Sequence, residues 1–241
     1  MEIIQAGLPV FLGSLLQGCT GFGFSLLAVP LLLFFFEGTL VIPLLVLLSL
    51  AMNGAVWIDC GSHLSRRTLG GLLLGGVAGL LPGLWILNLF PASALRLTAG
   101  LFVTASALAL LLGFRRPLPP RLWALLAVGF ASGLLNGSLS MSGPPVILFL
   151  ANQGADKNVF RSTLAGYFLS LNVVTTVLFL AKGMIARPTM GLYFACLPAL
   201  AAGTLLGIVL ARRVPERLFR LLALVVLISM GLSLTASALK P

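Results

Sequence analysis

Charged residues are scarce in this sequence. Only 8% of its 241 residues are charged, whereas 59% are hydrophobic. Soluble globular domains carry roughly 25% charged residues, so the composition excludes a soluble fold and predicts an all-α polytopic membrane protein in the lipid bilayer. A spanning helix needs about 20 apolar residues. Eight apolar stretches can be drawn, at residues 3–36, 39–58, 68–89, 92–113, 121–151, 160–181, 188–211 and 215–238.

Acidic residues and histidine are rarer still. His63 is the single histidine, and the five acidic residues all lie near predicted loops, at Glu2, Glu37, Asp59, Asp156 and Glu216. Proton pumps and cation antiporters usually keep a carboxylate deep in the membrane, and this chain has no evident candidate. It also contains no Ser/His/Asp set, no metal-ligand cluster and no phosphate-binding loop. The sequence therefore argues against a membrane enzyme and predicts no cofactor and no metal site.

Cysteine is sparse, and basic residues outnumber acidic ones. Cys19, Cys60 and Cys196 are odd in number and lack metal-ligand spacing, which argues against a disulfide framework. The net charge is +10, but the basic residues lie between apolar stretches. They therefore serve orientation in the bilayer rather than nucleic-acid binding, with anionic lipid headgroups as expected partners.

Glycine, proline and small polar residues interrupt two of the apolar stretches, at residues 17–25 and at residues 136–145. Backbone groups freed from a helix inside a bilayer cost several kcal/mol each if they find no partner. Interrupted segments at matching places in two halves of a chain are the sequence indication of a transporter's substrate site.

The two breaks belong to an internal repeat. Gly18 matches Gly137, and Asn53 matches Asn172, in both cases 119 residues later. Further matches follow in the same order: Thr68 with Thr189, Gly79 and Gly83 with Gly203 and Gly207, and Pro91 and Arg96 with Pro215 and Arg220. We expect an N-terminal membrane repeat at 1–113 and a C-terminal membrane repeat at 121–241, each of about four apolar blocks, joined by a basic, proline-rich linker at 114–120.

The basic residues distinguish two topologies. If the first and fifth stretches each cross the membrane once, alternate loops hold eight and seven basic residues, which specifies no orientation. If each stretch is a re-entrant hairpin, one face holds eleven and the other four, as the positive-inside rule requires. Residues 5–18 and 24–36 are each too short to span and fit two half-helices. We therefore expect inverted repeats, each beginning with a broken helix, and both termini on the non-cytoplasmic side.

The breaks predict a site for a small anionic substrate. An unwound hinge exposes N–H groups at the start of the next helix, and that end carries about half a positive charge. We expect such starts near Phe24 and at Gly143. Neutral groups around both hinges and two repeat-related asparagines complete the candidate substrate-binding set: Gln17, Gly18, Thr20, Gly21, Gly23, Ser25, Asn53, Asn136, Gly137, Ser138, Ser140, Ser142, Gly143 and Asn172.

Close packing of helices is the competing interpretation for several small or polar residues. Asn53 and Asn172 are also suited to hydrogen bonds between helices. Arg161, which follows the second break, is either a solvated loop charge or an attractor of anions to the cytoplasmic mouth. Four glycines remain open between a functional role and packing, at Gly79, Gly83, Gly203 and Gly207. Four others are expected to form one packed helix face, at Gly70, Gly71, Gly75 and Gly76.

Together these motifs resemble the TauE/SafE family of sulfite exporter-like permeases, also called the toluene-sulfonate uptake permease family. The resemblance covers nearly the whole chain and rests on residues 18–23 with Pro30, 137–145, 160–168, and 203–207 followed by 212–215. It implies a bacterial or archaeal inner-membrane transporter of small sulfur-containing anions or organic acids, such as sulfite or sulfonates. Residues 140–145 lack the glycine-rich run that is common in the family.

The sequence thus predicts a permease that works by alternating access and holds its anion at the two hinges. A passive anion channel is one alternative. A membrane subunit that serves a sulfur-metabolising partner enzyme is another, and a homo-oligomer is compatible with each.

Overall fold

A computed structural model describes residues 2–20, 22–60, 66–112, 121–151, 153 and 157–211, together with seven residues between 225 and 236. In this part of the chain there are nine helices and no strand: α1 (Glu2–Thr20), α2 (Phe24–Leu33), α3 (Gly38–Cys60), α4 (Arg66–Leu89), α5 (Ala92–Leu111), α6 (Leu122–Leu139), α7 (Gly143–Ala151), α8 (Lys157–Ala181) and α9 (Arg187–Ala211). The all-α prediction is confirmed.

Five of these helices are long and apolar enough to cross a membrane: α3, α4, α6, α8 and α9. The stretches predicted at 3–36 and 121–151 each hold two helices, and the other stretches that the structure describes hold one each. The linker at 114–120 and most of the stretch at 215–238 lie outside the described residues.

The half-helix expected at residues 5–18 is longer than predicted. α1 has 19 residues and α6 has 18, which correspond to about 28 Å and 27 Å, so neither is a half-helix. Only α2 and α7, with 10 and 9 residues, are half the length of a span. The first helix was expected to end at Gly18. Instead α1 continues to Thr20, and Gly18 packs closely against α9.

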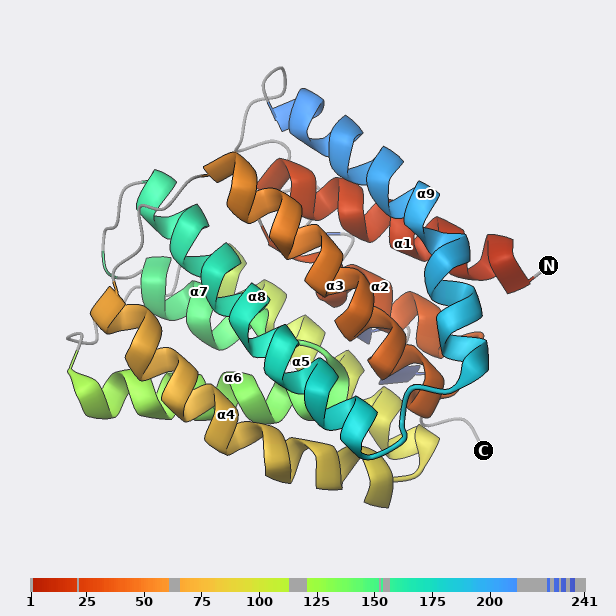
Figure 1. Cartoon of the computed structure of the whole chain (residues 1–241), viewed down its shortest axis with the longest axis horizontal. Coiled ribbons are helices and arrows are strands. Elements are labelled where there is room, and N and C mark those ends of the chain that lie inside the picture. The colour runs from red at the N-terminus through yellow and green to blue at the C-terminus, as the bar shows by residue number, and fades with distance from the viewer. Residues whose placement is uncertain are drawn as a thin grey trace.

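The helices form three packed pairs. α1 lies along α9 on one side, α4 lies along α6 on the other, and α3 and α8 lie between them (Figure 1). The colour order shows α1, α3 and α9 running in one direction and α4, α6 and α8 in the opposite direction (Figure 1). Because α1 and α3 begin on the same side, α2 must lead the chain back to that side. By the same reasoning α7 leads the chain back to the side where α6 and α8 begin.

Glycines set the close contact between α4 and α6. A Cβ on Gly79 would meet the carbonyl oxygen of Phe130, and one on Gly133 would meet the carbonyl oxygen of Gly76. A Cβ on Gly83 would lie 3.1 Å from the Cα of Gly137. The two backbones therefore touch without intervening side chains, as small residues allow in membrane helices.

The pair of α1 and α9 is built in the same way. A Cβ on Gly207 would lie 2.9 Å from the Cα of Gly18, and one on Gly203 would lie 2.5 Å from the carbonyl oxygen of Phe11. The packing interpretation of Gly79, Gly83, Gly203 and Gly207 is therefore confirmed. It was wrong for Gly70, which is exposed with open space around it, because it lies about 100° around α4 from Gly71.

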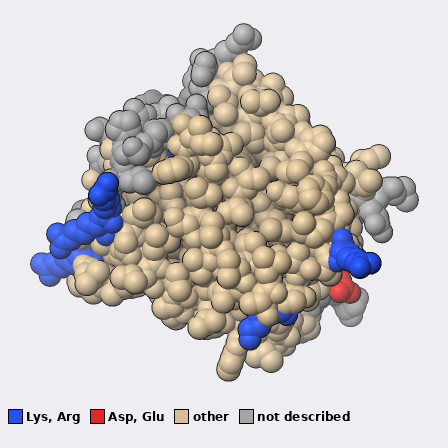
Figure 2. All heavy atoms as spheres, viewed as in Figure 1, with Lys and Arg blue, Asp and Glu red and all other residues tan. Residues whose placement is uncertain are grey.

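Polarity is arranged inside out. Large apolar side chains such as Trp85, Val177 and Leu205 are exposed, whereas Gln17 and Asn136 are buried. The Lys and Arg side chains visible in Figure 2 lie at the edges of the view, and a broad uncharged area fills its middle. An apolar exterior around a polar interior suits a protein whose solvent is lipid, and the chain is a multi-pass membrane protein.

Candidate pocket between the two helix breaks

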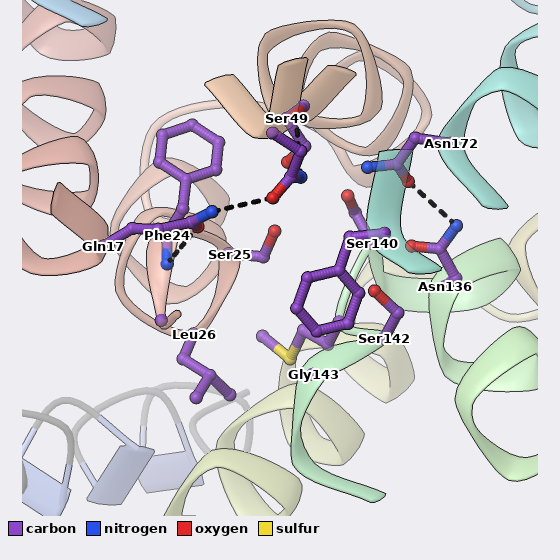
Figure 3. Close-up of a pocket in the computed structure, with 14 residues that line it drawn as sticks. Gln17, Phe24, Ser25, Leu26, Ser49, Asn136, Ser140, Ser142, Gly143 and Asn172 are labelled. Atoms are coloured by element: carbon purple, nitrogen blue, oxygen red, sulfur yellow. Dashed lines mark hydrogen bonds between the residues drawn. The ribbon is translucent and has the colours of Figure 1, made fainter. Parts of the chain in front are cut away.

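A pocket lies where the two helix breaks approach each other (Figure 3). Its cavity measures about 30 Å³, which is room for about two water molecules. Nine predicted site residues line it, from both breaks and from α1, α3, α6 and α8: Gln17, Gly23, Ser25, Asn53, Asn136, Ser140, Ser142, Gly143 and Asn172. Among the described residues that line it, none has an ionisable side chain.

Left-handed backbone conformations occur at both breaks. Gly23 precedes α2 with φ of 105°, a conformation that costs glycine little. Ser140 ends α6 with φ of 54°, and its N–H donates to the carbonyl oxygen of Asn136. After these turns α2 begins at Phe24 and α7 at Gly143. These are the residues at which the hinge pattern in the sequence predicts helix starts.

The side chain of Gln17 makes the hydrogen bonds that hold the first break in place. The Nε2 of Gln17 on α1 donates to Oδ1 of Asn53 on α3 at 2.9 Å, and its Oε1 accepts the N–H of Phe24 at 3.2 Å. Asn53 in turn donates to the carbonyl oxygen of Ser49 at 2.8 Å. The Gln17 amide therefore ties together α1, α3 and the start of α2.

The second break has a similar amide pair. Nδ2 of Asn136 on α6 lies 3.2 Å from Oδ1 of Asn172 and 2.9 Å from Oγ1 of Thr175, both on α8, and donates to these atoms. Ser132 donates to the carbonyl oxygen of Ser142 at 2.6 Å and steadies the turn before α7. Asn53 and Asn172 thus bond across helices, as the packing interpretation expects, and both also line the pocket.

Three serines lie between the two amide pairs: Ser25, Ser140 and Ser142 (Figure 3). Ser140 is 2% exposed, and its Oγ has no hydrogen-bond partner. A buried polar atom without a partner costs about 1–3 kcal/mol. A water molecule or a ligand in the pocket would supply that partner.

The two helix starts offer unequal numbers of N–H donors to the pocket. At α2 the N–H of Phe24 is taken by Gln17, which leaves the N–H groups of Ser25 and Leu26 outside the intrahelical pattern. At α7 the second and third residues are prolines without an N–H, so Gly143 provides the first donor alone. α2 therefore directs more N–H donors to the pocket than α7, whose start contributes mainly its dipole.

Three of the remaining predicted residues, Gly18, Gly137 and Ser138, do not line the pocket. Gly18 and Gly137 are packing residues, since a Cβ on either would lie 2.7 Å from a carbonyl oxygen of the neighbouring helix, that of Thr204 or Leu80. Ser138 donates to the carbonyl oxygen of Leu134. The side chain of Thr20 and all of Gly21 lie outside the described part of the chain.

Five lining residues were missed: Phe24, Leu26, Ser49, Met141 and Phe168. For two of them the sequence spacing could have identified the residue. Ser49 and Phe168 each precede a predicted asparagine, Asn53 or Asn172, by four residues and so lie on the same helix face.

The chain matches the family described as "Sulfite exporter TauE/SafE" over residues 6–234. It belongs to this family. Membership in the TauE/SafE family implies a membrane transporter of sulfur-related anions, and its members are transporters rather than enzymes. Neither the comparison with curated proteins nor the comparison with solved structures found a match.

Proposed function

We propose that the protein moves a small sulfur oxyanion across the cell membrane of a bacterium or archaeon by alternating access, with the anion held in the pocket between the two breaks. The observation that carries the proposal is the convergence of two helix starts on a buried, neutral, polar pocket. Helix N-termini attract anions through their N–H groups and dipoles.

The neutrality of the pocket suits a ligand that must be released. The N–H groups near Ser25 and Gly143 and the serine hydroxyls attract an anion without a fixed positive charge. A buried arginine would add a full positive charge and a bidentate pair of bonds to the sulfur oxyanion, whereas in this pocket only the ligand is charged. A site built from neutral donors therefore exchanges its ligand more readily.

The size of the cavity favours a compact ligand. Its volume of about 30 Å³ suits an anion of few non-hydrogen atoms. An aromatic sulfonate would require the pocket to widen. Sulfite and its close relatives are therefore the first candidates.

Pseudo-symmetry between the halves supports two inverted repeats, at 1–113 and 121–241. The pairs Gln17–Asn53 and Asn136–Asn172 each join residues that are 36 apart in sequence. The contacts of α1 with α9 correspond to those of α6 with α4, and α1 and α6 run in opposite directions (Figure 1). In this arrangement each pair, α1–α2 and α6–α7, enters and leaves the membrane on the same face with a long first helix and a short second one, the two pairs enter from opposite faces, and alternating access exchanges the roles of the halves.

Basic residues support an orientation with both termini outside the cytoplasm. Under the hairpin topology Arg66, Arg67 and Arg121 gather on one face, while Lys182 and Arg187 lie on the other. The more basic face is then cytoplasmic.

A cysteine placed at residue 2 tests this orientation. In intact cells a Glu2→Cys variant should react with a membrane-impermeant thiol reagent added outside, because the start of α1 is then on the non-cytoplasmic face. Labelling that occurs only after the cells are opened would contradict the topology.

Purified protein in proteoliposomes tests the substrate. Sulfite, thiosulfate, sulfoacetate, taurine and short carboxylates are compared, first by thermal stabilisation and then by flux. A true ligand at 100 times its Kd stabilises the protein by about 2.7 kcal/mol. A carrier should exchange labelled for unlabelled anion across the membrane.

Other outcomes separate the remaining candidates. Flux far above carrier rates without counterflow identifies a channel. Activity that appears only when a partner enzyme is added identifies a membrane subunit. Stabilisation by short carboxylates but by no sulfur compound would overturn the substrate class.

A further inference from the structure

Two corresponding faces lead away from the pocket, one on α3 and one on α8. Residues at spacings of 4, 7 and 11 share one face of a helix. From the pocket toward the start of α8, one face of the helix carries Asn172, Phe168, Ala165 and Arg161 in that order. The α3 face has the same spacing and consists of Asn53, Ser49, Val46 and Ile42.

The α3 face is closed by a thick apolar layer. Ser49 lines the pocket, but Val46 and Ile42 beyond it are 0% and 1% exposed. Leu44 and Leu45, on the same turns, are fully buried. No polar side chain of α3 lies in this layer between residues 41 and 48.

The α8 face carries fewer large apolar side chains between the pocket and the start of the helix. Phe168 occupies the position that corresponds to Ser49, lines the pocket and is 6% exposed. Its Cζ lies 3.9 Å from where a Cβ of Gly143 would be, so the ring sits against the start of α7. Beyond it come the small, buried Ala165 and then the half-buried Arg161. Along this face one aromatic ring lies between the pocket and a small residue followed by a cation, while Leu164 on the same turns is fully buried, as Leu45 is on α3.

Buried polar atoms gather on the same half of α8. Thr163 and Tyr167 are 1% and 0% exposed; the hydroxyl of Thr163 meets no partner in hydrogen-bond geometry, and that of Tyr167 has the hydroxyl of Ser132 as its neighbour. Their counterparts on α3 are Leu44 and Leu48. An unpartnered buried hydroxyl costs about 1–3 kcal/mol, and a water or another conformation that supplies its partner would account for it. Thr163 and Tyr167 lie on the side of α8 turned away from Ala165, and they make this half of α8 more polar than the corresponding half of α3.

We propose that Phe168 is the gate of the pocket on the Arg161 side. Displacement of its ring opens a path along α8 from Asn172 past Ala165 to Arg161, while the α3 side stays sealed in this conformation. Arg161 stands at the mouth of the path and attracts the anion. The nature of the cargo rests on the proposed function, whereas the gate itself does not.

Thiol labelling at two matched positions tests the gate. All variants carry alanine at Cys19, Cys60 and Cys196, and single cysteines are introduced as Ala165→Cys or Val46→Cys. An anionic methanethiosulfonate is applied to purified protein in lipid nanodiscs. Adding Phe168→Ala should raise the labelling rate at position 165 by about tenfold or more, a change of about 1.4 kcal/mol in the opening equilibrium. Position 46 should stay unreactive.

Substitutions of graded size at Phe168 provide a second test of the gate. Phe168→Leu preserves bulk and should leave position 165 slow, whereas Phe168→Val should give an intermediate rate. The valine variant therefore decides the question if the alanine variant does not fold. The gate is refuted if position 165 labels equally fast whichever residue occupies position 168, or if position 46 becomes reactive instead. Because the readout is labelling, a failure of sulfur-anion transport leaves this result distinguishable.

Discussion

Replacing Gly143 with leucine is expected to reduce anion flux by about 100-fold or more while the protein remains folded. Gly143 opens α7 at the edge of a cavity of only about 30 Å³. A Cβ there would already lie 3.1 Å from Cδ1 of Ile147, so the rest of the leucine side chain must enter the cavity. A 100-fold loss corresponds to about 2.7 kcal/mol of lost binding. The measurement is uptake of labelled substrate into proteoliposomes.

Two variants control for this result. Gly191→Leu adds the same side chain on α9 where nothing lies within 4 Å, so its flux should equal that of the native protein. Gly143→Ala adds a single carbon and should retain part of the flux. Native flux in a folded Gly143→Leu variant would remove the pocket from the transport path.

Gly133→Ala should destabilise the protein strongly, although it adds only one methyl group. The added Cβ would meet the carbonyl oxygen, carbonyl carbon and Cα of Gly76 across the contact of α4 and α6. These are backbone atoms that cannot rotate away, so the helices must separate. Overpacking costs about 1–3 kcal/mol and occasionally more, and a backbone clash belongs at the upper end. We expect a fall in melting temperature of roughly 10 °C, measured by thermal unfolding in detergent.

Gly70→Ala is the matched control on the partner helix. Gly70 lies on α4 as Gly76 does, but it is exposed with open space around it. Alanine is favoured over glycine in a helix by about 1 kcal/mol, so this variant should be unchanged or slightly more stable. Equal melting temperatures for the two variants would show that the contact of α4 and α6 is not as close as described.

Helix starts were predictable from the sequence, and helix lengths were not. Glycine and proline restrict the backbone locally, which is why α2 and α7 begin at the expected Phe24 and Gly143. The preceding helices continue further than expected, to Thr20 and Leu139. Apolar residues lie on both sides of these two breaks, so hydropathy has little contrast there. Tertiary contacts then decide where a helix ends.

The pocket residues also include some that the sequence could identify and others that it could not. The amide residues Gln17, Asn53, Asn136 and Asn172 stand out by being polar in apolar helices, and all four line the pocket. Gly18 and Gly137 have the composition of hinge residues, yet they pack against neighbouring helices. A glycine carries no side chain whose chemistry separates these two roles. Only the position of α9 or α4 beside it does.

The sequence by itself determined that this chain is an all-helical membrane protein interrupted twice by polar breaks, because composition and local backbone preference require no partner. The tertiary structure decided which residues face the cavity. It paired α3 with α8 and brought Ser49 and Phe168 to the pocket. It also placed the bulky Phe168 of α8 at the pocket where α3 has Ser49. Such differences arise from contacts between segments distant in sequence, such as α3 and α8, which local sequence does not encode.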